Sequence, residues 1–274
     1  MVAKSQRVGY LGFMPVTRRL TSLPQGFQMG LMLLERGHHI RTGGKMPSGE
    51  FKEKALDLIN RLDEEDIDWV LVGAEAMNLY LKRPRATVDV DIVVRKKDFR
   101  KIEKVLREIC LELKETQVHW SGLVSRPPML LELDVIKSTS HVLFEATLDL
   151  KTIVDGVKAA PVECVLALKY LSSVSPWRPK GKKHIDIGDF IITFKDNAEH
   201  LNRDRLIHLA SRAHANAGKE FLVFLDAVIV LALFIPVVLS IAESVSMQSM
   251  TLSIQAMHGQ SIDWRYLWRA TRKE

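Results

Sequence analysis

Asp89 and Asp91 are the residues best placed to do chemistry, because they stand two apart in a run of β-branched residues, Val88-Asp89-Val90-Asp91-Ile92-Val93-Val94. Side chains two apart on a strand point to the same face of a sheet. Two neighbouring carboxylates repel each other unless a cation lies between them, and hard divalent ions such as magnesium prefer carboxylate oxygens. The pair therefore predicts either a divalent-metal site or the solvated face of an edge strand.

The segments around this pair predict an α/β unit. An apolar stripe of helical period follows Ser48, a possible helix cap. A short apolar strand ends at Gly73, and the last predicted strand carries a third acid, Asp134. Helices are expected over 48–62, 74–81 and 98–110, and strands over 69–72, 89–94, 115–120 and 129–136. These elements together predict a mixed sheet with flanking helices, an α/β (α+β) fold.

The chain after residue 160 reads as a helical half. Pro161 is placed to open a helix that includes Lys169, because proline is favoured at the first helical position. A loop rich in proline and basic residues follows, and further helices are expected over 184–195 and 201–215. We expect this half to form a separate domain over 161–219.

The positive charge is concentrated at the N-terminus. The 274 residues carry a formal net charge of +6, and residues 1–47 hold seven Lys or Arg and one acid, so the remainder balances with 32 of each sign. That balance argues against a broadly basic nucleic-acid surface. The leader, 1–47, is expected to be disordered, a targeting segment or a stretch upstream of the true start at Met46.

The two cysteines, Cys110 and Cys164, form no disulfide framework and no zinc spacing. Such usage is typical of a reducing compartment, so a cytoplasmic location is expected.

The tail, 220–274, contains an apolar run over 221–242. Its length predicts either a membrane-spanning helix, with the main domain held on the cytoplasmic side by the preceding basic residues, or a buried terminal helix. Asp226 lies within the run, and a carboxylate inside a bilayer is costly.

The order of these features resembles the nucleotidyltransferase superfamily of the polymerase-beta type, and most closely its AbiEii-like abortive-infection toxins. The resemblance rests on a strand ending at Gly73, the run Arg85-Ala86-Thr87-Val88-Asp89-Val90-Asp91, the later acid Asp134 and the helix segment Leu166-Ala167-Leu168-Lys169. It covers roughly residues 50–215. It implies that 48–160 is the catalytic domain.

The resemblance also implies roles for individual residues. Asp89, Asp91 and Asp134 would be the catalytic acids and would hold two magnesium ions. An NTP would be bound by Gly73, Ala74, Arg85, Thr87 and Lys169. Ala74 departs from the family pattern, which has Gly or Ser there, and this departure favours a non-catalytic member of the family. Asp186 and Asp189 keep the family's acid spacing, yet they equally fit a solvated helix face, just as Lys169 fits a surface lysine.

Three functions follow from this resemblance. The first is magnesium-dependent transfer of a nucleoside monophosphate from an NTP to a hydroxyl, with an RNA such as tRNA as acceptor and a cognate antitoxin as partner. The second is a non-catalytic NTP- or RNA-binding protein, and the third is nucleotidyl transfer to a drug or metabolite.

Overall fold

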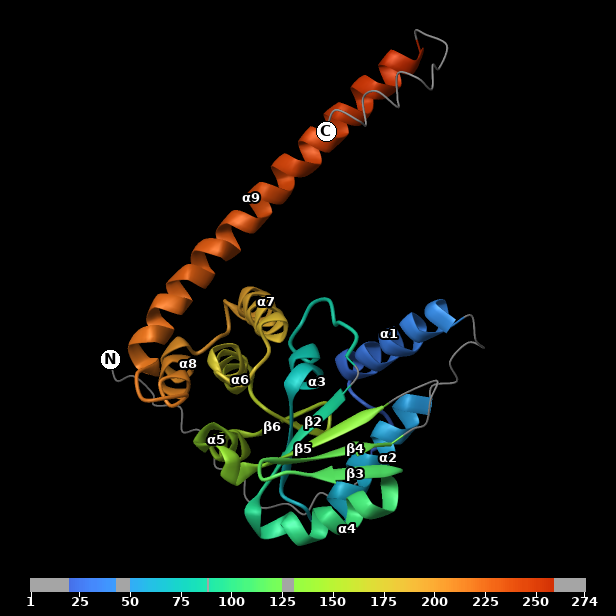
Figure 1. The fold of residues 1–274 in the computed structure, drawn as a ribbon, viewed down its shortest axis with the longest axis vertical. Helices are drawn as coiled ribbons and strands as arrows, with labels where there is room; N and C mark the ends of the chain where they lie inside the picture. Colours follow the sequence, from blue (N-terminus) through green and yellow to red (C-terminus); the bar gives the residue numbers. More distant parts are fainter. Residues whose placement is uncertain (1–19, 43–49, 88, 125–130, 259–274) are drawn as a thin grey trace, which may run out of the picture. The chain divides into compact units, whose positions relative to one another are not determined.

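The computed structural model describes residues 20–42, 50–87, 89–124 and 131–258. Its internal contacts divide the chain into two units, Met1–Phe221 and Leu222–Glu274. The first unit contains the sheet and every residue of the candidate site, and it is shown with its element labels in Figure 1. The expected domain bounds at 48–160 and 161–219 stay predictions.

A seven-stranded mixed sheet forms the centre of the first unit. Its order is β3-β4-β5-β2-β1-β7-β6. Strand β2 pairs with β1 antiparallel and with β5 parallel, so it is covered by a neighbour on each edge. The strands are β1 Trp69–Val72, β2 Asp89–Val94, β3 Glu112–Glu115, β4 His119–Leu123, β5 Glu132–Lys137, β6 Thr152–Val154 and β7 Val157–Ala159.

The helices alternate with these strands in the first half of the chain and follow each other in the second. They are α1 Gln25–Thr42, α2 Glu50–Glu64, α3 Gly73–Asn78, α4 Phe99–Ile109, α5 Val142–Leu150, α6 Val162–Val174, α7 Lys180–Asn197, α8 Arg203–Ala210 and α9 Ala217–His258, with short 3-10 turns Lys96–Asp98 and Ser138–Ser140. Pro161 directly precedes α6, where its missing N–H costs nothing.

The two faces of the sheet are covered by different helices. On β2, Val90 points to the face that α2 and α4 cover, and together with Leu133 of β5 it lines a cavity of about 540 Å³ there. Asp89 and Asp91 alternate with Val90 and therefore point to the other face, toward α3 and α6. Figure 1 shows α4 below the sheet and α6 and α7 above it.

Most expected elements are present, with shifted bounds. The helix expected at 74–81 ends at Asn78, and the strand expected at 115–120 is replaced by a hairpin of β3 and β4. The expected cap Ser48 lies outside the described residues. Three elements, α5, β6 and β7, occupy a stretch in which no regular element was expected.

Helix α1 was also not expected, because it falls in the basic leader. It packs against the domain through Phe27 and Leu31, whose side chains are buried. Gly26 lets it approach α3 closely, since a Cβ at this position would overlap the backbone of Asn78. The apolar residues of this segment do not repeat with a regular helical period. The segment is nevertheless helical, because its apolar side chains pack against the rest of the domain.

The apolar run at 221–242 lies within α9, the 42-residue helix Ala217–His258. Among the described residues, no helix combines the length and the apolar character needed to cross a bilayer. This finding argues against the membrane-spanning alternative for the described part of the run.

Candidate active site

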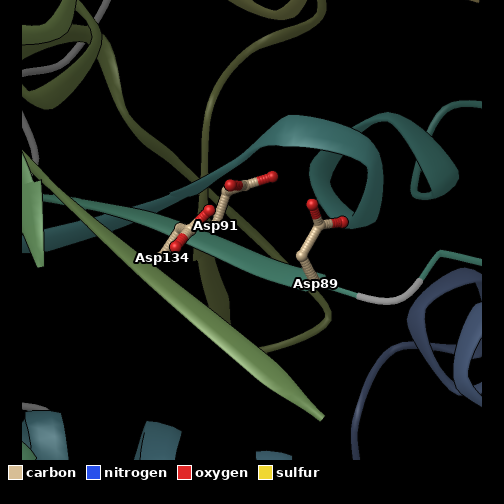
Figure 2. A group of neighbouring side chains, drawn as sticks. All are labelled: Asp89, Asp91 and Asp134. Carbon is tan, nitrogen blue, oxygen red and sulfur yellow. The ribbon is translucent and has the colours of Figure 1, made fainter. Parts of the chain in front are cut away.

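Parallel pairing of β2 and β5 brings the three predicted acids together. In the register, Asp91 lies opposite Asp134, and Asp89 lies one pair further along the same face. Figure 2 shows the three side chains rising from these two strands. One carboxylate oxygen from each residue lies within 4.8 Å of the others, close enough for the three to hold a metal ion. The alternative of a solvated edge strand is excluded for β2, because it has a neighbour on both sides.

The electrostatics of this cluster favour a cation. Burial, reinforced by the negative charges of Asp89 and Asp134, raises the pKa of Asp91 to about 7. Asp134 Oδ1 is buried and has no hydrogen-bond partner among the described residues. A buried carboxylate oxygen without a donor is costly, and a metal ion supplies the missing partner. The donor set, three carboxylates, is the one that magnesium prefers.

Gly73 makes room for this arrangement. It follows β1 directly and has a φ of 65°, a conformation that other residues adopt with strain. A Cβ at this position would overlap the carboxylate of Asp91. Gly73 is therefore required both by the turn that opens α3 and by the acid on the neighbouring strand.

Thr87 orients one of the acids. Its side chain is buried, and its hydroxyl donates a hydrogen bond of 2.6 Å to Asp89 Oδ1. This bond fixes one oxygen of the carboxylate and leaves the other to face the cavity. Thr87 thus acts on the candidate site through Asp89.

Arg85 stands at the end of a turn that Asn78 holds in place. The Asn78 amide donates to the Arg85 carbonyl at 2.9 Å, and the Arg85 N–H donates back to Asn78 Oδ1 at 3.0 Å. The guanidinium then makes a two-pronged pair with Asp189, at 3.0 and 2.8 Å. A planar fork of this kind matches a carboxylate well and fixes its direction. Arg85 therefore ties the turn before β2 to helix α7.

Lys169 is buried within the same ionic cluster. Its ammonium group lies 3.1 Å from Asp186 Oδ1 and 2.6 Å from Asp189 Oδ2. The guanidinium of Arg178 donates two hydrogen bonds to the carboxylate of Asp186, at 2.8 and 3.2 Å. Both acids are almost fully buried, so they form the base of the cluster and not a solvated helix face. We call these five residues, Arg85, Lys169, Arg178, Asp186 and Asp189, the ionic cluster.

The three acids and most of the ionic cluster line a common cavity of about 520 Å³. Its lining includes Asp89, Asp91 and Asp134 as well as the cations Lys169, Arg178 and Lys182. Gly73 and Ala74 border it from the turn at the end of β1. Such a cavity offers both oxygen ligands for a cation and cationic groups for an anion, which suits a metal-bound phosphate ester.

Glu75 is a further buried acid close to this site, and sequence analysis did not single it out. It is 0% exposed, and Asn78 donates to one of its oxygens at 3.2 Å. Burial, reinforced by the charge of Asp89, raises its pKa to about 9. Glu75 is therefore protonated at neutral pH.

Glu75→Gln should change how stability depends on pH. The folded state keeps the Glu75 proton up to about pH 9, whereas the unfolded state releases it near 4.5, the ordinary value. The contribution of this group is thus complete below pH 4.5 and is lost as pH rises through 9. Between pH 6 and 9, the free energy of unfolding of the variant should rise relative to that of the wild type by on the order of 3 kcal/mol. Urea unfolding measures this difference.

Glu103→Gln, on the surface of α4, is the matched control and should show no such trend. Parallel pH dependences for Glu75→Gln and the wild type would mean that Glu75 ionises normally.

The structure brings the predicted residues to one site. Three of those predicted to bind an NTP contact acidic side chains of the protein instead. Asp89, Asp91, Asp134, Gly73, Ala74, Arg85, Thr87 and Lys169 all line the cavity. However, Thr87 is bonded to Asp89, and Arg85 and Lys169 are paired with acids. Arg178 and Lys182 were not among the predicted site residues. The available signal was the basic, proline-containing segment after the Lys169 helix, which holds Arg178 and continues into the first turn of α7 with Lys182.

Similarity to solved structures is weak. JHP933 from Helicobacter pylori is 16% identical with a TM-score of 0.44, over 76% of this chain and 97% of that one. The antibiotic-resistance factor ANT(2'')-Ia is 14% identical with a TM-score of 0.40, over 59% and 88% of the two chains. At these values neither likeness adds to the argument. No curated protein matches the chain.

The family comparison is more specific. Residues 57–185 match the model of the family described as nucleotidyl transferase AbiEii toxin, type IV TA system. This segment contains the turn at Gly73, the acids on β2 and β5, and Lys169 on α6. The match and the geometry agree with the resemblance seen in the sequence. The match over residues 57–185 therefore supports assignment of the chain to the nucleotidyltransferase superfamily of transferase enzymes.

Proposed function

We propose that this protein transfers a nucleoside monophosphate from an NTP to a hydroxyl acceptor with magnesium bound at Asp89, Asp91 and Asp134. The observation that supports this most is the gathering of three carboxylates within 4.8 Å in a cavity that cationic side chains also line. A solvated acidic patch would not require a glycine beside it or leave a buried oxygen of Asp134 without a donor.

The three carboxylates fit a magnesium ion by their chemistry and spacing. Asp89, Asp91 and Asp134 would hold it, and a second ion would share Asp89 and Asp91. Bound magnesium supplies charge neutralisation for the attacking and leaving oxygens of the displacement. The half-buried position of Asp91 strengthens every such interaction, because the local dielectric is lower than in water.

The remaining residues bind and orient the substrate. Arg178 and Lys182 line the same cavity as the acids and would meet the charge of a triphosphate. Gly73 and Ala74 border the cavity with backbone, and Ala74 retains the N–H of the small residue it replaces. Thr87 holds the Asp89 carboxylate, and the ionic cluster keeps its cationic side chains in place.

The matched family suggests a biological setting. Its description as a type IV toxin supports the proposal that this protein is the toxin of a toxin–antitoxin pair and has an antitoxin partner. The acceptor is proposed to be the 3′ end of an RNA such as tRNA. Two other proposals remain, a small-molecule acceptor and a non-catalytic nucleotide-binding role, the latter favoured by Ala74 in place of the usual Gly or Ser.

Incubation with labelled NTPs, magnesium and total RNA tests this function. We expect label in RNA with the wild type, and none when magnesium is chelated or when Asp89→Ala and Asp91→Ala are combined. A parallel incubation with aminoglycosides and other small hydroxyl compounds tests the small-molecule acceptor. Tight NTP binding without label in any acceptor would support the non-catalytic role, and transfer that survives the double substitution would exclude the proposed site.

A further inference from the structure

An exposed tryptophan stands beside the cavity. Trp177, between α6 and α7, is 91% exposed, whereas Trp69 and Trp120 are buried. Tryptophan is highly buried on average, so a ring left in water over nearly its whole surface is unusual and is available to stack on a ligand. Its chain neighbour Arg178 lines the cavity, while Trp177 itself does not. Trp177 is thus not a lining residue, and it is one position along the chain from one.

The backbone around Trp177 is held in one conformation. The Arg178 N–H donates to the Ser175 carbonyl at 3.3 Å, which closes a turn with Pro176 and Trp177 at its centre. Proline is favoured at the first central position of such a turn, and it fixes φ. Arg178 is also anchored by its fork onto Asp186. A ligand that stacks on Trp177 therefore orders little additional chain, which lowers the entropic cost of binding.

A run of cations follows the tryptophan. From Trp177 to Ile185 the chain contains no acid, and Lys180, Lys182 and Lys183 lie within the first turns of α7. None of these three lysines makes an ion pair with another described residue. Lys182 reaches the cavity, while Lys180 and Lys183 do not line it. The positive charge therefore extends from inside the cavity to the surface near Trp177.

We propose that Trp177, Lys180 and Lys183 bind the single-stranded 3′ end of a polynucleotide and direct its terminal hydroxyl into the cavity. This inference rests on the proposed function, and it assigns residues outside the cavity to the binding of its acceptor. An aromatic ring on which a base stacks, next to cations that meet phosphates, is the common means of holding a single strand. Lys182 connects this surface to the cavity.

The charge distribution selects a strand end over a duplex. Outside the leader the chain is balanced in charge, which argues against a broadly basic surface for a double helix. One aromatic ring that stacks on a base and a few lysines that contact phosphates are enough to bind the last nucleotides of a single strand. In the transfer, the 3′-oxygen forms a bond to the α-phosphorus as the bond to the bridging oxygen breaks. Pyrophosphate leaves with the electron pair, and the hydroxyl proton passes to water.

Binding of a short oligoribonucleotide with a free 3′-hydroxyl to the full chain, in EDTA, tests the surface without turnover. Trp177→Ala should weaken binding roughly 5- to 100-fold, the effect of one lost stacking contact, and Trp177→Phe should restore most of it. Lys180→Ala with Lys183→Ala should weaken binding and make its salt dependence shallower by about 0.7 in the log–log slope per lost phosphate contact. Lys96→Ala with Lys97→Ala, on exposed residues outside the cavity, is the matched control and should bind like the wild type.

The possible results distinguish a failure of the Trp177 binding surface from a failure of the proposed nucleotidyl transfer. An affinity unchanged by Trp177→Ala, with thermal unfolding also unchanged, overturns the inference. Transfer to small hydroxyl compounds without any oligonucleotide binding overturns it as well, and leaves the proposed function standing. Trp177-dependent binding without transfer to any acceptor supports the surface and contradicts the function. A deoxyribonucleotide arm distinguishes RNA from DNA, and either strand bound through Trp177 supports the inference.

Discussion

Asp91→Asn should abolish nucleotidyl transfer while making the metal-free protein more stable. The amide cannot bring a negative charge to magnesium, so we expect activity to fall roughly a thousandfold or more, about 4 kcal/mol of transition-state stabilisation. In the metal-free protein the substitution removes a carboxylate that is half-buried and faces Asp89 and Asp134. The variant should thus lose its function without losing its fold.

The gain in stability has a defined pH window. The folded pKa of Asp91 is raised to about 7 from an ordinary 3.8, so its contribution to stability is complete below 3.8 and is lost as pH rises through 7. Without metal, the free energy of unfolding of Asp91→Asn should therefore be larger than that of the wild type by on the order of 2 kcal/mol at pH 8. The two values should be equal near pH 4. Saturating magnesium should reduce or reverse the difference, because only the wild type binds the ion tightly in its folded state.

Two measurements check this prediction, labelled-NTP transfer and urea unfolding in EDTA and in magnesium. Asp204→Asn, on an exposed acid of α8, is the control and should leave both unchanged. Activity retained within tenfold by Asp91→Asn would remove Asp91 from the metal site. A variant less stable than the wild type at pH 8 without metal would show that the three acids do not repel one another as their spacing requires.

Lys169→Met should destabilise the protein by about 3 kcal/mol, in the range for breaking a buried ion pair. Methionine matches the length of the lysine stem but leaves Asp186 and Asp189 sharing a buried space with less positive charge. Arg178 and Arg85 remain as partners of these two acids, which keeps the loss below that of an isolated buried pair. Urea unfolding measures the effect.

Lys101→Met provides the matched comparison. Lys101 is on the exposed surface of α4, 3.8 Å from Asp98, and such pairs contribute about 0–1 kcal/mol. Combining Lys169→Met with Asp189→Asn should recover part of the loss, because the second change removes the charge left without its partner. A loss for Lys169→Met no larger than that for Lys101→Met would mean that the ionic cluster does not hold α6 and α7 together.

The sequence by itself determined the face on which the acids lie. Asp89 and Asp91 share a side of β2 because side chains alternate along any strand, whatever its neighbours. Strand β1, the turn at Gly73 and the helix after Pro161 were likewise expected, because apolar period, glycine and proline act locally. The mixed α/β architecture followed from the order of these elements.

Only the tertiary structure decided which partners these residues meet. The parallel register of β2 and β5 places Asp134 opposite Asp91, and register depends on packing between segments far apart in the chain. The packing of α7 on α6 buried Asp186 and Asp189 around Lys169, where the sequence allowed equally for a solvated face. Helix α1 formed for the same reason, since its weak local period was outweighed by the apolar surface that Phe27 and Leu31 cover. Local patterns fix the direction in which a side chain points, whereas burial and charge pairing are set by whatever the fold brings against it.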